Sequence, residues 1–452
     1  MKRFPLASAA AVLMWAAGAR AQVAPPAPDS VAVGDWHLAP VVEARVRGEY
    51  RHDLDAQDRG TLLERARLGV DAERGPIELR VVLEDARLWD LGAGSDTIGQ
   101  PGQLAYTGPY EAWADAHTAG ARPSFVRVGR QPVTWGEGRL LGAADWSPTG
   151  RALDAVRGRL VVGSWSFELL AASLSDPVPP TGVVLTGGLF SPAYGELVGA
   201  RAEWAIDPLF AVEAYTLDRF AQQNPEASLD DTVRGETYTG ALRLHGDAHG
   251  WTWGAEGAGQ LGHASVIAKD RLAWAAAGHV GYTFEYVRML PTVRLGASYA
   301  SGDDGTGSKF GQFDPLLPDV HEWHGAMDLF AWSNEWEANA RVAIAPWTDA
   351  VAALDYRYAQ LATADGWWVS SYLFTLGRAP GNTSGELGHE IDAYLAWSPW
   401  VPVELSAGYS MLVLGAGAKA ALSADLTNPA VPRLSPPDLA HYAYGQVTVR
   451  LP

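Results

Sequence analysis

Apolar and polar residues alternate over much of the chain from residue 41 onward. In the segment 42–51 apolar residues take almost every second position, and the positions between them are charged: Glu43, Arg45, Arg47, Glu49 and Arg51. The same alternation returns in 335–344, 390–397 and 403–410. Because neighbouring side chains of a β-strand point to opposite faces, each segment can place one face against lipid and the other in water. The pattern predicts membrane-spanning strands.

This alternation separates into eighteen segments of strand length. An even number returns the C-terminus to the side where the N-terminus began, as single-chain bacterial barrels require. We therefore predict an all-β fold, a transmembrane antiparallel β-barrel of about 18 strands. The predicted strands are 41–52, 61–72, 76–89, 109–118, 123–132, 151–162, 164–173, 196–206, 209–218, 234–245, 250–261, 271–284, 291–301, 335–346, 350–361, 388–398, 402–412 and 438–451.

The connections between the predicted strands are short and long in turn. Every second connection is a long loop rich in Gly, Asp, Ser and Pro. A barrel inserted from the periplasm has this asymmetry, whereas a soluble sandwich has no reason for it. We expect the short turns and both termini in the periplasm and the long loops outside the cell. Tight turns fall at 73–76, 119–122, 163–164, 206–208, 346–349 and 398–400.

Composition agrees with one large barrel. Hydrophobic residues make up 48% of the chain, yet the mean hydropathy is only −0.06, as expected when apolar residues take alternate positions. The alternative is a soluble secreted all-β enzyme, but nothing in the pattern predicts helices to cover the charged strand faces. Aromatic residues flank the predicted short turns, as in the aromatic belt of a membrane barrel: Trp165, Trp204, Trp251, Tyr282, Phe284, Tyr286, Trp347, Trp397 and Trp400.

The first 21 residues have the features of a secretory signal peptide, with a basic start, an apolar stretch at 6–18 and small residues at a cleavage site. We predict a periplasmic lead-in at 22–40 and the barrel at 41–452. Loss of Lys2, Arg3 and Arg20 would take the formal net charge from −18 to −21, which disfavours nucleic-acid binding. The chain has no cysteine, which excludes disulfides and thiolate metal sites.

A motif rich in glycine, arginine and acidic residues fills positions 127–157. It reads GRQ at 129–131, GEGRLLG at 136–142, DW at 145–146, GR at 150–151 and Asp at 154. Two further stretches follow it, 300–304 with 313–321 and 388–392 with 408–410. Together they resemble the alginate export family of outer-membrane β-barrel porins, from the first predicted strand to the seventeenth. The last residues, Leu451-Pro452, depart from the aromatic ending usual in such barrels.

The resemblance implies a monomeric barrel that passes an anionic polyuronate through an arginine-lined pore narrowed by inward loops. Arginine suits this role because its guanidinium stays charged and binds carboxylates with two hydrogen bonds, while exposed pairs remain weak enough to release the polymer. Only four of the 34 basic residues are lysines. The candidate pore-lining or substrate-path residues are Arg45, Arg47, Arg65, Arg67, Arg127, Arg130, Arg139, Asp145, Arg151, Asp154, Arg157, Arg294 and Arg341.

The alternation predicts a lumen wall of mixed charge. It also turns Arg51, Arg201, Arg243 and Arg357 inward. For each arginine the alternative role is an ion pair with a carboxylate on a neighbouring strand. The carboxylates predicted to face the lumen are Glu43, Glu49, Asp71, Glu203, Glu213, Glu256, Glu335, Glu337, Asp355, Glu390, Asp392 and Glu404.

The loop from Pro132 to Arg151 is the candidate constriction. Glycines around it let the backbone turn tightly. Its charged residues could contact a passing solute or pair with one another to hold the loop, and the second role is favoured. These are the glycines Gly129, Gly136, Gly138, Gly142 and Gly150 and the charged residues Arg130, Arg139, Asp145 and Arg151.

No catalytic or cofactor signature is found in the sequence. Asp303-Asp304 lacks the acidic spacing of a calcium loop, and His321-Glu322-Trp323-His324 lacks the spacing of a zinc-protease helix. The glycines at 136–142 lack the spacing and the helix of a nucleotide loop, and no serine nucleophile motif is present. We therefore expect no enzymatic activity, no cofactor and no metal.

We expect an outer-membrane channel of the alginate-export type that passes an anionic polysaccharide or a related acidic solute. The alternative is a general or substrate-specific diffusion porin for small solutes, since a family name does not fix what each member carries. An adhesin or a barrel-borne enzyme would need a closed lumen or a catalytic set. The expected partners are outer-membrane lipid and lipopolysaccharide, the barrel-assembly machinery, the solute and, for export, a periplasmic secretion scaffold.

Overall fold

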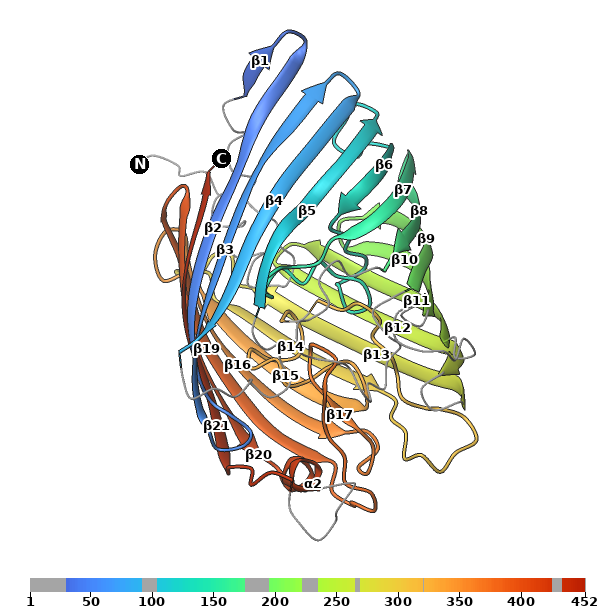
Figure 1. Cartoon of the computed structure of the whole chain (residues 1–452), viewed down its shortest axis with the longest axis vertical. Helices are drawn as coiled ribbons and strands as arrows, with labels where there is room; N and C mark the ends of the chain where they lie inside the picture. Colours follow the sequence, from blue (N-terminus) through green and yellow to red (C-terminus); the bar gives the residue numbers. More distant parts are fainter. Residues whose placement is uncertain are drawn as a thin grey trace.

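The computed structural model describes residues 30–91, 104–174, 195–221, 235–264, 269–319, 321–424 and 433–451. The predicted signal peptide and the first part of the predicted lead-in lie outside these residues. The described chain forms a closed antiparallel barrel of 18 strands, as the sequence predicts (Figure 1).

Each barrel strand pairs with its neighbour in sequence order, and β2 pairs with β21 to close the sheet. Val42 of β2 lies opposite both Leu68 of β3 and Leu451 of β21. The strands are β2 (Trp36–His52), β3 (Asp58–Arg74), β4 (Ile77–Asp90), β5 (Leu104–His117), β6 (Phe125–Gln131), β7 (Leu153–Val162), β8 (Trp165–Ser173), β9 (Gly195–Asp207), β10 (Phe210–Ala221), β11 (Gly235–Ala248), β12 (Trp251–Ala264), β13 (Lys269–Thr283), β14 (Thr292–Ala300), β15 (Glu335–Ile344), β16 (Ala350–Leu361), β19 (Glu386–Trp400), β20 (Val403–Leu414) and β21 (Leu439–Leu451).

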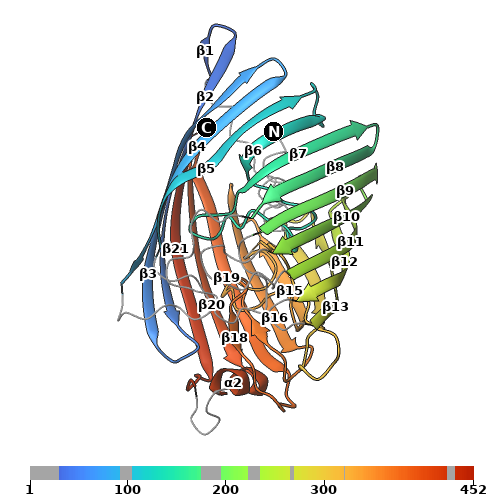
Figure 2. The same ribbon diagram turned by 45° about the vertical axis from the view of Figure 1, so that its right-hand side comes forward.

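Four small elements complete the described chain. β1 (Val31–Val33) pairs with the start of β2, and β17 (Trp368–Val369) pairs with β18 (Thr375–Gly377) in a separate ribbon. Helix α2 (Ala416–Ser423) follows β20. Figure 2 shows α2 at the end of the barrel opposite the β3–β4 turn. Within the described residues, no helix has both the length and the apolar character needed to cross a membrane.

Several strands extend beyond their predicted limits. β2 begins at Trp36 instead of 41, and its pairing with β3 continues to His37 opposite Glu73. β5 begins at Leu104 instead of 109. Backbone hydrogen bonds between strands do not require apolar side chains, so the sheet continues past the residues that alternate clearly.

The two faces of the wall differ as the alternation predicts. Outward positions carry exposed apolar side chains such as Leu68, Val126 and Leu169, whereas inward positions carry buried charged ones. Aromatic rings gather on the outer face of the barrel beside the short turns. There Trp165 stacks on Trp204 with ring centroids 5.1 Å apart. Trp347 lies 6.1 Å from Trp397 at another short turn. This arrangement confirms the predicted aromatic belt and fits an outer face in contact with lipid.

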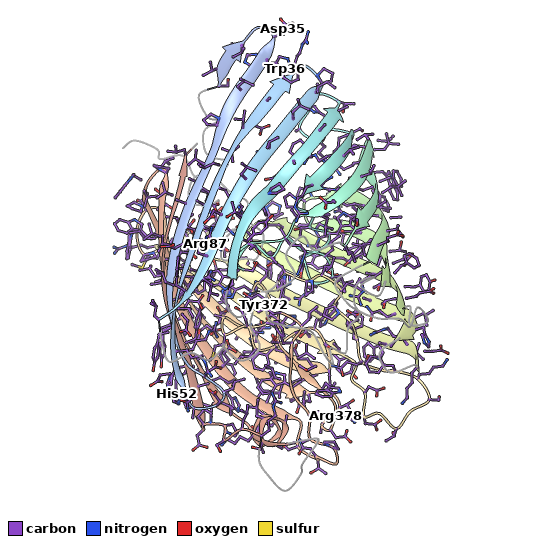
Figure 3. The ribbon with its side chains drawn as sticks, viewed as in Figure 1. Asp35, Trp36, His52, Arg87, Tyr372 and Arg378 are labelled. Atoms are coloured by element: carbon purple, nitrogen blue, oxygen red, sulfur yellow. The ribbon has the colours of Figure 1, made fainter. Side chains whose placement is uncertain are left out.

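Long connections occupy part of the barrel interior. Tyr372 belongs to the connection between β17 and β18. In Figure 3 it lies near the middle of the barrel's length, away from the rim marked by Asp35 and Trp36. Burial, reinforced by Asp328, raises the pKa of the Tyr372 hydroxyl above its ordinary value despite nearby Arg47. The lumen is therefore narrower than the wall alone would leave it.

Candidate constriction and solute path

Two long loops fold into the barrel. The first inward loop is residues 132–152 between β6 and β7, and the second inward loop is 301–319 and 321–334 between β14 and β15. Their large apolar side chains pack against small inward residues of β7 to β14, mainly alanines. Burial of such side chains stabilises the docked loops. The buried loop residues include Trp135, Leu140, Leu141, Phe313, Leu316 and Trp332.

The two inward loops are joined by backbone hydrogen bonds. Leu317 donates to Leu140 O at 3.0 Å and receives a bond from Gly142 at 2.9 Å, while Asp319 donates to Gly138 O at 2.7 Å. A side chain at Gly142 would come within 2.7 Å of the Asp319 nitrogen, so this contact requires glycine.

Side chains strengthen the junction between the loops. One nitrogen of Arg151 donates to Leu317 O at 2.7 Å and to Pro318 O at 2.8 Å. The indole of Trp146 stacks on His321 with centroids 3.7 Å apart. The two loops therefore act as one body inside the lumen.

Four arginines of β2 and β3 hold the first inward loop from the wall. We call Arg45, Arg47, Arg65 and Arg67 the arginine clamp. Arg45 donates to the carbonyls of Asp145 and Ser147, both at 2.7 Å, and Arg47 donates to Trp146 O at 3.0 Å. Arg47 also lies over the Trp146 ring, 3.8 Å from its centroid.

Asp145 is the charge at the centre of the arginine clamp. Its carboxylate lies 2.8 Å from Arg67 Nη1 and 3.1 Å from Arg65 Nη1. Arg65 and Arg67 also bind wall carboxylates, Glu43 and Glu84. Their side chains are only 1% and 8% exposed, so they hold the loop and present little surface to a solute. The structural role favoured by the sequence is the one these contacts support.

Arg139, within the first inward loop, also has a structural role. It lies 3.3 Å from Glu137 and 4.2 Å from the centroid of Trp323, whose indole donates to Glu137 O at 2.6 Å. Burial alone would raise the pKa of Glu137, but Arg139, His279 and Arg243 hold its pKa below its usual range. Glu137 therefore stays ionised and connects the first inward loop to the wall.

A second set of arginines lies on the inner face of β6 to β11. We call Arg127, Arg157, Arg201 and Arg243 the charge belt. Arg127 binds Asp115 at 3.0 Å and Arg157 binds Glu168 at 2.6 Å.

The other two arginines of the charge belt share one carboxylate. Arg201 and Arg243 bind Glu213 at 2.6 and 3.2 Å. The side chains of the charge belt are 12–23% exposed, more than those of Arg65 and Arg67.

A third basic group lies on β14 and β15. Arg294 and Arg341 are directly opposed in the sheet, and Arg341 binds Asp355 at 2.6 Å. In the described part of the chain, Nε and Nη1 of Arg294 have no hydrogen-bond partner. Trp323 of the second inward loop lies 5.5 Å from its guanidinium. A buried guanidinium with unused hydrogen-bond donors can bind an anion, so Arg294 is a second candidate contact for an acidic solute.

Two predicted path residues are placed differently. Arg130 and Asp154 form an ion pair at 3.0 Å, but each lies two residues from an outward valine, Val128 or Val156, on the same face, and the Asp154 side chain is 47% exposed. Their position follows from the two-residue period of β6 and β7. The prediction that they line the pore is therefore wrong for these two, and we exclude them from the path proposed below.

Sequence reasoning missed several inward arginines, which are Arg80, Arg159, Arg219 and Arg271. Arg159 lies two residues after Arg157 on β7, so the same period could have identified it. It borders a cavity of about 670 Å³ near the β3–β4 and β5–β6 turns. Glu78, Asp115, His117 and Arg127 also line this cavity.

The described residues contain three groups of side chains that could be considered as metal ligands. In the first, Asp303 and Asp304 accept hydrogen bonds from Gly305 and Thr306 within their own turn, which agrees with the missing calcium-loop spacing. Two clusters of histidine and carboxylates remain, one with His117 in the cavity above and one with His324, Glu335 and Glu337.

Comparison with known proteins agrees with this architecture. The family model described as alginate export matches residues 40–431. No curated protein matches the chain in sequence.

Solved outer-membrane porins share the fold. OccAB2 of Acinetobacter baumannii superposes with a TM-score of 0.57 at 12% identity, covering 91% of this chain and 97% of that one. OprD of Pseudomonas aeruginosa gives 0.56 at 10% identity over 94% and 96%, and OccK2 (OpdF) of the same organism, in complex with glucuronate, gives 0.56 at 10% over 92% and 98%. At these identities the likeness concerns the fold alone. The family model spans most of the chain, and the protein belongs to the alginate export family of outer-membrane β-barrel channels.

Proposed function

We propose that this barrel passes carboxylated solutes, first of all an anionic polysaccharide of the polyuronate type. The observation that carries the proposal is the charge belt, a row of partly exposed arginines on the inner face of β6 to β11. Guanidinium groups bind carboxylates with two hydrogen bonds, and each belt guanidinium keeps part of its surface exposed although its wall carboxylate is buried. A solute carboxylate can therefore bind the exposed side of a belt guanidinium while the wall carboxylate stays in place, and it can leave again.

The belt, not the arginine clamp, is the proposed path. Arg45, Arg65 and Arg67 are occupied by the first inward loop, so a solute would have to displace buried contacts to reach them. Arg159 extends the proposed path because it borders the same cavity as Arg127, and Arg294 is added because two of its nitrogens have no hydrogen-bond partner among the described residues. The barrel supplies no chemistry in this proposal and acts as a selective passage.

Small acidic solutes are the second candidate. The two inward loops are joined to each other and docked on the wall, which narrows the lumen. A narrow lumen favours passage of a single sugar acid over passage of a polysaccharide. Solved structures of similar fold contain small acids, glucuronate in OccK2 and vanillate in OpdK. Both candidates require anion selectivity, and they differ in the size of solute that blocks or crosses the channel.

The deciding experiment is single-channel recording of the refolded barrel in a planar bilayer. We expect anion selectivity from the reversal potential in a salt gradient, and block by micromolar-to-millimolar polyuronate. The Arg127→Gln and Arg157→Gln variants should lower the selectivity and weaken the block. Arg87→Gln is the matched control, because Arg87 pairs with Asp85 and is 37% exposed on the outer face of β4. Passage of glucuronate without polyuronate block would favour the small-solute candidate, and a wide conductance indifferent to both would contradict the proposal.

We also propose that the short turns face the periplasm. The chain has no cysteine, so single-cysteine variants can be labelled without background. Thr306→Cys in a long loop should react with an impermeant maleimide on intact cells, whereas Ser164→Cys in the β7–β8 turn should react only after the outer membrane is opened. The reverse pattern would contradict this orientation.

A further inference from the structure

One buried cluster in the lumen plays no part in the proposed path. His324 of the second inward loop faces Glu335 and Glu337, which begin β15. All three residues are buried, with exposed fractions of 8%, 2% and 1%. His324 Nδ1 lies 3.3 Å from Glu335 Oε2 and 3.3 Å from Glu337 Oε2.

The geometry fits a tetrahedral cation. Metal bonds of 2.0–2.1 Å to nitrogen and oxygen in a tetrahedron separate the ligand atoms by about 3.3 Å. The three ligand atoms, one from each side chain, all lie within 4.8 Å of one another. One histidine with two carboxylates is a ligand set that zinc accepts, and it leaves a fourth position for water.

In both glutamates Oε2 faces His324, and the other oxygen, Oε1, is bound by neighbouring side chains that fix the orientation of the carboxylate. Glu337 Oε1 accepts a hydrogen bond from Asn339 at 2.6 Å and also binds Arg357. Glu335 Oε1 accepts one from Ser298 at 3.3 Å. Such outer contacts are typical of metal sites, where they fix the ligand that faces the ion.

The inner oxygen of Glu335 supplies an independent observation. In the described residues, Glu335 Oε2 is buried and accepts no hydrogen bond, although it points at His324. Burying a carboxylate oxygen without a hydrogen bond costs folding free energy unless a cation lies close to it.

The excess of negative charge around the cluster also favours a bound cation. Arg357 lies opposite Glu390 in the sheet and binds Glu337, so one cation serves several carboxylates. Asp392 lies opposite Asp355, and Asp355 already binds Arg341. The carboxylates of β15 and β19 therefore outnumber the arginines next to them, and a divalent ion would balance the excess.

We propose that His324, Glu335 and Glu337 bind a zinc-like divalent cation that fastens the second inward loop to β15. The ion links a loop residue to two wall residues, so it fixes the position of Trp323, whose carbonyl also accepts a bond from Arg357 at 2.9 Å. The proposal stands independently of which solute crosses the channel. The competing occupant of the same three side chains is a proton shared as an imidazolium hydrogen bond.

The test is zinc binding by the refolded full-length barrel after treatment with a chelator. We expect one tight zinc ion per chain by calorimetry, with an affinity at least about tenfold weaker in both His324→Gln and Glu335→Gln. The control is His117→Gln, which alters the other histidine cluster and should leave this affinity unchanged. Tetrahedral Co²⁺ absorption in the wild type, absent from His324→Gln, is a second readout.

Folding of the variants can be checked independently. Glu335→Gln keeps the size of the side chain and removes one buried charge, so it should fold, as judged by heat-modifiable gel mobility and by conductance. Equal zinc affinity in the wild type, His324→Gln and Glu335→Gln would overturn the proposal and indicate surface binding. No zinc binding at micromolar concentration would also overturn it and favour the shared proton.

Discussion

The arginine clamp and the charge belt contain the same residue type on the same face of one barrel, yet their contacts differ. Clamp arginines donate to backbone carbonyls and to Asp145 of the first inward loop. Belt arginines bind carboxylates of neighbouring strands. The side chains of Arg65 and Arg67 are 1% and 8% exposed, whereas those of the belt are 12–23% exposed.

The difference arises from what lies over each wall. A loop backbone presents several carbonyl oxygens together, and buried carbonyls need donors, so the clamp guanidiniums are committed to structure. The belt guanidiniums bind wall carboxylates and remain 12–23% exposed, although Glu137 of the first inward loop reaches Arg243. Under the proposed function, an inward arginine contacts a solute only where no loop buries its guanidinium.

The largest expected effect is at Asp145. Asp145→Ala removes two charged contacts at once, to Arg65 and to Arg67, and hydrogen bonds to charged groups contribute about 1.5–3 kcal/mol each. We expect the first inward loop to detach, which should raise the single-channel conductance and the open-channel noise and lower the unfolding midpoint in guanidinium chloride.

The matched control for Asp145 is Asp154→Ala. Asp154 binds Arg130 on the outer face and is 47% exposed, so its loss should change stability by less than about 1 kcal/mol and leave the conductance as it is. Equal effects of the two substitutions would contradict the distinction between clamp and outer pair.

A smaller loss is expected for Arg67→Lys, which keeps the charge. Arg67 binds Glu84 at 2.6 Å, Asp145 at 2.8 Å and Thr149 O at 3.1 Å, and it lies over the ring of Tyr110 at 3.4 Å. An ammonium group cannot reach these partners in the same plane, so we expect a loss of about 1–3 kcal/mol in the free energy of unfolding. Wild-type stability in Arg67→Lys would show that charge alone holds the loop.

Belt substitutions should cost less. Arg201→Gln leaves Glu213 bound to Arg243 at 3.2 Å and to the Gly136 nitrogen at 3.1 Å, so no buried charge loses all its partners. We expect a stability change of about 1 kcal/mol or less, together with a measurable shift of the reversal potential toward cations. A large loss of stability with unchanged selectivity would place Arg201 with the clamp.

Much of the wall could be predicted from the sequence, and the interior could not. The two-residue period yields every barrel strand and the inward direction of Arg45, Arg127 and Arg341, because the period is local. It also could have placed Arg130 and Asp154 outside. That Arg45 binds Asp145 O depends on a contact between residues one hundred positions apart, and no local pattern records such a contact.

The smallest expected effect concerns Glu137, where the two regions meet. Glu137 lies 3.3 Å from Arg139 of the first inward loop and 3.4 Å from Arg243 of the charge belt. The lowered pKa of Glu137 means that its ion pairs stabilise the docked loop fully above its ordinary pKa of 4.5, and that this contribution is lost as the pH falls through the lowered pKa.

In conductance recorded from pH 7 down to pH 3, the contribution of Glu137 to the channel noise should therefore be absent above about pH 4.5 and appear below it. Glu137→Gln is expected to remove this part of the acid response, since the amide does not titrate. Other lumen carboxylates titrate in the same range, so the informative quantity is the difference between wild type and variant. An identical acid response in both would show that Glu137 does not couple the docked loop to the belt, and the two regions would then be independent.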